Sequence, residues 1–291
     1  MKVKDHMLTQ EEFELVFDDT LQCYRTVPVP EDLSPYYESD KYISHTDSSK
    51  GMVDWVYQKV KRFQLSQKRS RLLRLVSSDF SLLDVGTGTG DWPVYLQERG
   101  HKVHGLETSS AARKMAMSKG IEVYSSWEEL KNKSFRVITM WHVLEHLEDP
   151  SEALRQLSDC LEPGGVLLIA VPNFRSYDAK KFGAYWAAYD VPRHLWHFSS
   201  KTIQRLGEEA GLVWIRKWPM WFDVFYVSLL SEKYKPNSNH LHAAWVAFRS
   251  TLSALRTNEH SSMLYALQKP EKAIYKRFKR LLPRKLCNAL R

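Results

Sequence analysis

From residue 81 onward, short apolar runs of strand length alternate with segments of helix length, and this alternation limits the folds open to the chain. Strands that alternate with helices form right-handed βαβ units around a parallel sheet. The pattern therefore predicts an α/β fold with a doubly wound sheet. Strands are expected at 82–85, 103–106, 121–124, 137–140, 166–171, 212–217 and 262–267, and helices at 91–99, 109–119, 151–161 and 201–210.

The segments outside this alternation set the expected boundaries. Residues 1–48 are polar and contain several prolines, and they are expected to form an irregular extension with one short strand near 13–17. Helical spacing of apolar residues over 50–76 predicts one or two helices that lead into the core. The main domain is expected to span 49–270, with a loop at 174–199 and a helical insertion at 220–260, before a basic tail at 271–291.

The positive charge is concentrated at one end of the chain. The net charge is +8, and residues 271–291 hold eight lysines or arginines against one glutamate. A basic nucleic-acid-binding face is therefore not indicated, and nucleic acid is not an expected partner. The tail is expected to be either a helix with a solvated charged face or a weak contact to an anionic membrane surface.

The sequence predicts neither a membrane-spanning helix nor a secretory signal. No apolar run approaches the roughly 20 residues that a membrane-spanning helix needs, and the N-terminus lacks the apolar core of a secretory signal. The three cysteines, Cys23, Cys160 and Cys287, form no CxxC motif. They indicate a reducing compartment, so we expect a cytoplasmic protein without disulfides.

A glycine-rich loop carries the chemistry. The sequence DVGTGTGD at 84–91 follows an apolar strand and precedes a helix, which is the context of a nucleotide-binding loop. Gly86 and Gly88 remove side chains where the backbone turns and approaches a ligand. Glu107 ends the next strand, where an acid can accept hydrogen bonds from the ribose hydroxyls of an adenosine group. The alternative is a purely structural strand-to-helix turn.

The charges of this loop distinguish two adenosine ligands. The dinucleotide fingerprint GxGxxG requires glycine at 91, but the residue is Asp91. Together with Asp84 it would repel a pyrophosphate at the helix N-terminus. It would attract an ammonium or sulfonium group by about 4 kcal/mol at about 4 Å and an effective dielectric constant near 20. The loop therefore favours S-adenosylmethionine, whose product is S-adenosylhomocysteine, over NAD.

Three segments in order resemble the class I S-adenosylmethionine-dependent methyltransferases, near the ubiquinone-biosynthesis O-methyltransferase type. They are the glycine loop at 84–90, FRVITMWHVLEHL at 135–147 and LEPGGVLL at 161–168. The resemblance implies a methyltransferase with a Rossmann-like sheet of seven strands. Most of these strands would be parallel, and the two late strands would form an antiparallel C-terminal hairpin.

The resemblance also implies roles for individual residues. Asp84, Gly86 and Gly88 would contact the methionine portion of the cofactor, and Glu107 the ribose. The adenine would lie against Ser126 and Trp127, although Ser125 stands where an acid often precedes this contact. The remaining implied positions follow the fourth strand at its carboxyl end and are Met140, Trp141 and His142.

The methyl acceptor is expected beside these residues. His142 is the preferred candidate base and His194 a second one, whereas His146 is expected to be structural. An aromatic segment, residues 185–199, follows the fifth strand and resembles segments of uncharacterised bacterial methyltransferases. It is expected either to form a wall of the acceptor site or to be a packed loop in which Ser199 caps a helix. Its candidate acceptor-binding residues are Tyr185, Trp186, Asp190, Arg193 and His197.

The sequence indicates no metal site. Those bacterial relatives often carry an N-terminal cysteine cluster that resembles a small zinc module, but only Cys23 remains here, and one thiolate cannot complete a zinc site. The expected function is methyl transfer to an oxygen or nitrogen of a small-molecule or envelope-associated acceptor. A non-catalytic methyltransferase-like binding protein and, less favoured, an NAD-dependent oxidoreductase remain the alternatives.

Overall fold

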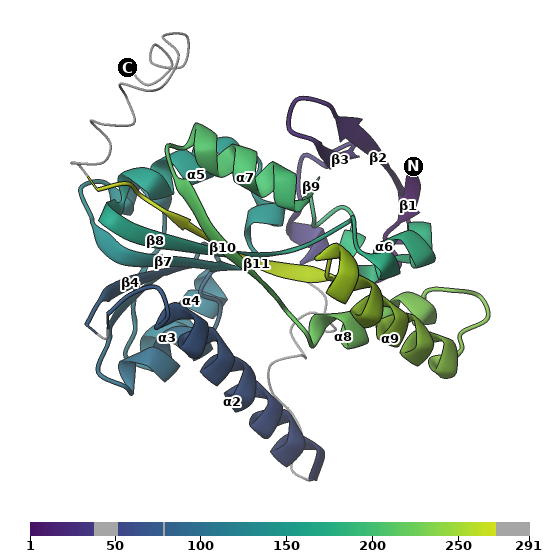
Figure 1. Cartoon of the computed structure of the whole chain (residues 1–291), viewed down its shortest axis with the longest axis horizontal. Helices are drawn as coiled ribbons and strands as arrows, with labels where there is room; N and C mark the ends of the chain where they lie inside the picture. Colours follow the sequence, from purple (N-terminus) through teal and green to yellow (C-terminus); the bar gives the residue numbers. More distant parts are fainter. Residues whose placement is uncertain (38–51, 78, 272–291) are drawn as a thin grey trace.

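The computed structural model describes residues 1–37, 52–77 and 79–271 (Figure 1). Its strands are β1 (Lys2–Lys4), β2 (Glu12–Asp18), β3 (Cys23–Val27), β4 (Ser81–Val85), β5 (Lys102–Leu106), β6 (Glu122–Tyr124), β7 (Phe135–Trp141), β8 (Leu161–Pro172), β9 (Trp196–His197), β10 (Val213–Pro219) and β11 (Ser262–Gln268). Its α-helices are α2 (Met52–Leu72), α3 (Asp91–Gln97), α4 (Ser110–Ser118), α5 (Pro150–Asp159), α6 (Tyr177–Phe182), α7 (Ser200–Glu209), α8 (Asp223–Lys233) and α9 (His240–Thr257).

A seven-stranded sheet forms the centre of the molecule, in the order β10-β11-β8-β7-β4-β5-β6. Neighbours from β8 to β6 pair in parallel, whereas β11 pairs antiparallel with both β8 and β10. This confirms the predicted doubly wound α/β fold with its antiparallel C-terminal hairpin. The chain leaves β4 in one direction to build β5 and β6, and returns on the other side with β7. A ligand crevice is therefore expected between the carboxyl ends of β4 and β7.

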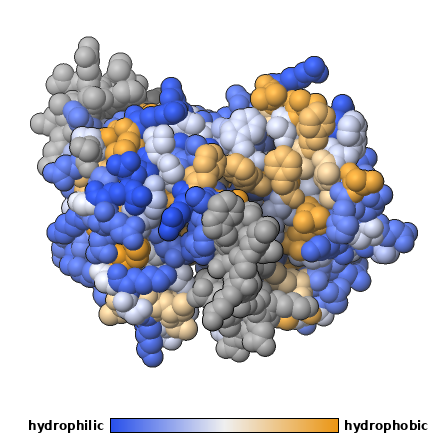
Figure 2. Space-filling view, turned by 90° about the horizontal axis from the view of Figure 1, so that it is seen from below, coloured by the Kyte–Doolittle hydropathy of each residue, from blue (hydrophilic) through white to orange (hydrophobic). Residues whose placement is uncertain are grey.

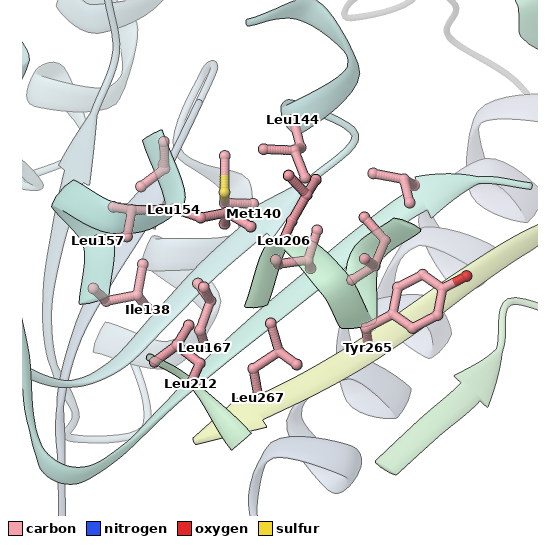
Figure 3. Close-up of a cluster of buried hydrophobic side chains, with 14 of the residues drawn as sticks. Ile138, Met140, Leu144, Leu154, Leu157, Leu167, Leu206, Leu212, Tyr265 and Leu267 are labelled. Atoms are coloured by element: carbon pink, nitrogen blue, oxygen red, sulfur yellow. The ribbon is translucent and has the colours of Figure 1, made fainter. Parts of the chain in front are cut away.

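Apolar side chains that alternate along the strands build a core on each face of this sheet. On one face, Ile138 and Leu167 pack with residues of α5 and α7 such as Leu154 and Leu206 (Figure 3). On the other face, the strands pack against Leu72 at the end of α2 and Trp92 of α3. The alternation is strict because successive side chains of a strand point to opposite faces.

The N-terminal region is more regular than the irregular extension that the sequence predicted for residues 1–48. β1, β2, β3 and β9 form a separate four-stranded antiparallel sheet, in which Tyr24 pairs with His197. A third apolar core joins this sheet to residues 174–191 and to α8 and α9, with Phe13, Trp186 and Val227 among its members. β9 is two residues long and lies far from β3 in sequence, so local periodicity could not reveal the pairing.

Helices α8 and α9 fill the interval between β10 and β11 and lie on the side of the molecule away from β4 and β5 (Figure 1). They expose many large apolar side chains, and Figure 2 shows hydrophobic residues gathered over this part of the surface. Among the described residues, no helix is long and apolar enough to cross a bilayer. Cys23 and Cys160 are free thiols, whereas Cys287 and the basic tail lie beyond the described residues.

Candidate functional site

The glycine loop between β4 and α3 has the left-handed backbone that its glycines allow. Gly86, Gly88 and Gly90 have φ of +67°, +55° and +84°. A Cβ atom on Gly86 would lie 2.4 Å from Cγ2 of Val143, so this glycine is needed for packing as well as for its backbone conformation. A Cβ atom on Gly88 would meet nothing within 4 Å. Gly88 therefore has open space beside its backbone.

Asp84, at the end of β4, forms a buried acidic centre beside this loop. Its carboxylate accepts hydrogen bonds from Thr139 Oγ1 at 2.6 Å and from Thr87 Oγ1 at 3.1 Å. Burial raises the pKa of Asp84 to about 6, although these hydrogen bonds and the charge of Lys68 act in the opposite direction. The fold thus holds a carboxylate at an energetic cost at the carboxyl end of a central strand, as ligand-binding sites often do.

Asp91 has a different environment from the one that its sequence position suggested. Its carboxylate forms ion pairs with Lys61 Nζ at 2.6 Å and with Lys119 Nζ at 3.2 Å. Burial acts to raise the pKa of Asp91, but the two lysines outweigh it and lower the pKa. The negative charge of Asp91 is therefore compensated within the protein. Of the two carboxylates to which the sequence assigned a preference for a sulfonium over a diphosphate, only Asp84 is without a lysine ion pair at this distance in the described part of the chain, so the argument from Asp91 does not hold.

A cavity of about 290 Å³ lies at this switch point of the sheet. Lys68 of α2 enters it with its Nζ atom 3.9 Å from the ring centre of Trp141. Burial lowers the pKa of Lys68 to about 8, against the charges of Asp84, Asp223 and Asp91. The sequence does not reveal this cation as a site residue, because apolar spacing over 50–76 predicts a helix but not what its polar side chains contact. The lining residues are Lys61, Gln64, Leu65, Lys68, Asp84, Gly86, Thr87, Thr89, Asp91, Trp92 and Trp141.

The other predicted cofactor residues differ in their access to this cavity. Glu107 directly follows β5, and its two carboxylate oxygens accept hydrogen bonds from the backbone N–H groups of Gly88 at 2.8 Å and Ser109 at 2.9 Å. It braces the glycine loop and keeps further lone pairs for a hydroxyl donor. Met140 is fully buried in the core. Ser126 and Trp127 follow β6 and do not line the cavity.

His142, the predicted base, joins two elements instead of standing free. Its Nδ1 atom lies 3.2 Å from Glu145 Oε1 in the short turn η3 (Leu144–His146), and its Nε2 atom lies 3.3 Å from Asp223 Oδ2 at the start of α8. Burial opposes its charged form, but these two carboxylates outweigh burial and raise the pKa of His142 to about 10. An imidazolium that keeps its proton at neutral pH cannot accept another, so these contacts do not fit a general base.

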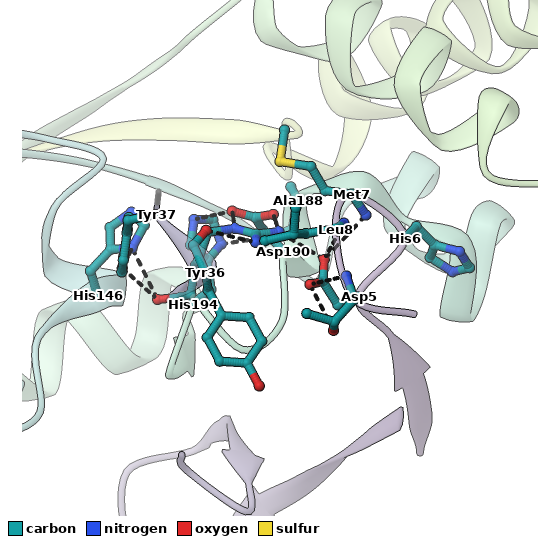
Figure 4. A network of polar contacts seen from close by, with 12 residues as sticks. Asp5, His6, Met7, Leu8, Tyr36, Tyr37, His146, Ala188, Asp190 and His194 are labelled. Carbon is teal, nitrogen blue, oxygen red and sulfur yellow. Dashed lines mark hydrogen bonds and ion pairs between the residues drawn. The ribbon is translucent and has the colours of Figure 1, made fainter. Parts of the chain in front are cut away.

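The aromatic segment that follows β8 is mostly buried. Arg193, with 1% of its surface exposed, forms a bidentate ion pair with Asp190, and its Nη2 atom lies 3.1 Å from Asp5 Oδ1 (Figure 4). Trp186 donates its indole N–H to Asp178, and His197 lies 3.0 Å from Thr26 Oγ1. These groups bind one another and the N-terminal sheet, so Arg193 has no free donor face for an acceptor carboxylate. The packed-loop alternative fits them better.

Tyr185 and His194 differ in burial, since His194 is buried. Tyr185 is half-buried, and its ring centre lies 5.4 Å from that of His6. His194 approaches His146, with 4.6 Å between the two ring centres. Ser199 caps α7 as expected, since its hydroxyl accepts the backbone N–H of Thr202.

Comparison with known proteins agrees with this fold. Residues 57–217, more than half of the chain, match a family model described as a methyltransferase domain. A ubiquinone biosynthesis O-methyltransferase of Aeromonas salmonicida is 29% identical over 148 residues, which are 45% of this chain and 62% of that protein. The corresponding enzyme of Nitrosospira multiformis is 31% identical over 49% of this chain and 65% of its own length. The chain thus spans less than two thirds of these relatives.

Solved structures with a similar fold share little sequence with the chain. A putative sarcosine dimethylglycine methyltransferase from Galdieria sulphuraria has a TM-score of 0.54 and 15% identity, over 74% of this chain and 88% of that one. The [4+2]-cyclase SpnF has a TM-score of 0.51 and 16% identity, over 70% and 80%. The likeness shows the fold, and the family match shows the lineage. The chain belongs to the methyltransferase domain family, within the class I S-adenosylmethionine-dependent type.

Proposed function

We propose that the protein transfers the methyl group of S-adenosylmethionine to an oxygen of an acceptor that carries an apolar portion. The observation that carries the proposal is the cavity between β4 and β7, which is lined by Asp84, Lys68 and Gly86 of the glycine loop. The names of the relatives favour oxygen over nitrogen as the methylated atom.

The cavity residues fit the charges of the cofactor. The methionine portion of S-adenosylmethionine carries an ammonium group, a carboxylate and a sulfonium. Asp84 supplies a carboxylate for the cationic groups, and Lys68 supplies a cation for the carboxylate. The indole N–H of Trp141 is buried without a partner in the described protein and offers one more donor. When bound, the cofactor supplies an activated methyl group, and the protein supplies orientation and a site shielded from water.

The acceptor would lie where β7 ends and α8 begins. Asp223, the first residue of α8, contacts His142 and so fixes this helix beside the cavity. Exposed apolar side chains run from this point along one face of α8: Phe222, Phe225, Tyr226 and Leu229. Their spacing places them on one side of the helix. An acceptor whose reactive oxygen enters the cavity could lay an apolar chain along this face.

Calorimetric titration with S-adenosylmethionine, S-adenosylhomocysteine and NAD⁺ tests the cofactor. Binding of the first two without NAD⁺ is expected, and failure of both to bind would overturn the proposal. Tight binding without adenosylhomocysteine release over a broad panel of acceptors would favour the non-catalytic alternative.

A series of hydroxylated aromatic acceptors with alkyl chains of increasing length tests the apolar face. Each buried methylene contributes about 0.8 kcal/mol, so KM is expected to fall several-fold per added carbon until the face is covered. Phe225→Ala should remove most of this dependence and leave the rate with the shortest acceptor unchanged. Leu255→Ala, at the exposed far end of α9, is the matched control. A KM that ignores chain length would contradict the proposed acceptor class.

A further inference from the structure

Behind His142, three side chains with metal-ligating atoms converge without an assigned role. Glu145, His146 and His194 each offer one donor atom, and these atoms lie within 4.8 Å of one another. η3 supplies the first two residues, and the aromatic segment supplies the third. A backbone hydrogen bond of 2.8 Å from Leu195 N–H to the Glu145 carbonyl holds the two segments together.

Glu145 has an oxygen that the protein leaves without a partner. The residue is 1% exposed, and its Oε1 atom lies near His142. Its Oε2 atom is buried and has no hydrogen-bond partner in the described protein. An unpaired buried carboxylate oxygen costs free energy that a folded protein rarely leaves uncompensated. This oxygen is an independent sign that a donor or a cation belongs at this position.

Both histidines are oriented as metal ligands would be. The Nδ1 atom of His146 lies 3.0 Å from the carbonyl oxygen of Arg193, and the Nδ1 atom of His194 lies 2.9 Å from that of Ala188 (Figure 4). A carbonyl oxygen only accepts, so these contacts favour a proton on each Nδ1 and leave each Nε2 as the atom that can bind a metal. The Tyr37 hydroxyl, 3.0 Å from His146 Nδ1, can accept from the same N–H, and Asp190 Oδ2 lies 3.9 Å from His194 Nε2, beyond hydrogen-bond distance. Histidines that ligate metals usually donate their other nitrogen to a carbonyl or carboxylate in this way.

We propose that Glu145, His146 and His194 bind one first-row divalent transition-metal ion, with Zn²⁺ as the reference ion. Two imidazoles and one carboxylate select such ions over Mg²⁺, which prefers oxygen ligands. Bonds of about 2.0 to 2.1 Å at tetrahedral angles require donor atoms about 3.4 Å apart, so side-chain rotations would close the site. The expectation of no metal considered the cysteines, and this site contains none.

Three protein ligands leave at least one coordination position open. The three residues lie next to His142, which directly follows β7. The acceptor oxygen is proposed to enter near this end of β7. An exchangeable position there would suit an oxygen ligand from a small molecule. Binding of the ion itself depends only on this chain's residues and does not rest on the proposed methyl transfer.

Metal binding is tested on the whole chain, prepared without a histidine tag and stripped with a chelator. Calorimetry should show one Zn²⁺ or Co²⁺ ion per chain, and Co²⁺ should give the visible absorption bands of a four- or five-coordinate site. Mg²⁺ should bind at least 100-fold more weakly. Glu145→Gln and His194→Ala should each weaken binding by about 100-fold or more, since loss of an outer-shell partner alone costs 10- to 100-fold.

His240→Ala, which removes an exposed histidine at the start of α9, is the matched control and should leave the affinity unchanged. Adenosylhomocysteine affinity, measured on the same samples, separates failure of this site from failure of the cofactor site. No stoichiometric ion, or equal affinity in folded Glu145→Gln, would overturn the proposal. If the variants do not fold, anomalous diffraction from Zn²⁺-soaked crystals of the unmodified protein decides, and density elsewhere refutes the site.

Discussion

Polar residues on the two sides of His142 are used differently. Toward the expected cofactor position, Asp84 and Lys68 face a cavity that Gly86 of the glycine loop also lines. Toward the acceptor, Asp190 and Arg193 face each other and bind the N-terminal sheet through Asp5. The cofactor side keeps its charges available for a ligand, whereas the acceptor side has used them to fix a loop. Density of polar residues in a sequence therefore does not by itself locate a binding surface.

Loss of the buried arginine should have the largest effect. Arg193→Met leaves Asp5 and Asp190 without their cation, and breaking a buried ion pair in this way costs about 3 to 5 kcal/mol. Urea denaturation should show this loss in the free energy of unfolding. Arg155→Met, which removes an exposed pair with Glu152, should leave it almost unchanged, because water screens an exposed ion pair. If Arg193→Met left the free energy of unfolding unchanged and raised the KM for the acceptor, the structural role would be wrong and Arg193 would belong to the acceptor-binding surface.

A side chain added at Gly88 should weaken cofactor binding by more than backbone strain alone can explain. Gly88→Val and Gly100→Val both force a side chain onto a left-handed backbone with nothing within 4 Å. Only the first lies in the glycine loop, between Thr87 and Thr89, which line the cavity. Gly88→Val should weaken adenosylhomocysteine binding by at least about 50-fold, more than 2 kcal/mol, whereas Gly100→Val should lower stability and spare affinity. Similar affinities in calorimetry would mean that the cofactor does not approach Gly88.

Removal of the cavity cation should have a smaller, pH-dependent effect. Lys68→Met should weaken adenosylhomocysteine binding by about tenfold, or about 1.4 kcal/mol. Because the pKa of Lys68 is lowered to about 8, its charge is present below that pH and disappears above it. The affinity ratio of wild type to variant should therefore shrink between pH 7 and pH 9. A ratio independent of pH would exclude an ionic contact.

The smallest expected effect is that of Asp84→Asn, which should raise the free energy of unfolding at high pH instead of lowering it. Its pKa is about 6 in the fold against 3.8 ordinarily, so its contribution to stability is complete below about pH 4 and is lost as the pH rises through 6. Asp84→Asn removes the buried charge but disturbs the bonds from Thr87 and Thr139. A net gain of about 1 kcal/mol at pH 8 is expected. Denaturation at pH 4 and pH 8 measures it, and lower stability at pH 8 would contradict it.

The difference between the two sides also explains how far the sequence could predict the structure. The central strands, Asp84 and the glycine loop are encoded by local periodicity, and the structure places them as expected. β8 is an exception at one end, because it begins at Leu161 rather than at residue 166. The role of Arg193 depends on Asp5, 188 residues away. No local pattern records such a contact, and the same holds for Lys68 over Trp141.

His142 illustrates a second limit. Its position after β7 was predictable, but its chemistry is set by Glu145 three residues later and by Asp223 from the insertion. A histidine with one carboxylate neighbour and a free nitrogen can be a base, whereas one held between two carboxylates is a fixed cation. Residue type and strand register determine where His142 lies, whereas its two carboxylate partners determine its protonation state.

The insertion between β10 and β11 has an architectural consequence. Pro219 and Met263, which flank it, are paired neighbours in the sheet, so the polypeptide leaves and re-enters the scaffold at a single point. An exchangeable module could be grafted there without shifting the register of any other strand. Such a module would have to keep a carboxylate at its first helical residue to meet His142, and apolar side chains such as Val227 and Val246 to complete the third core. If the acceptor lies along α8 as proposed, acceptor preference can diverge through this insertion without a change in the strands that carry the glycine loop.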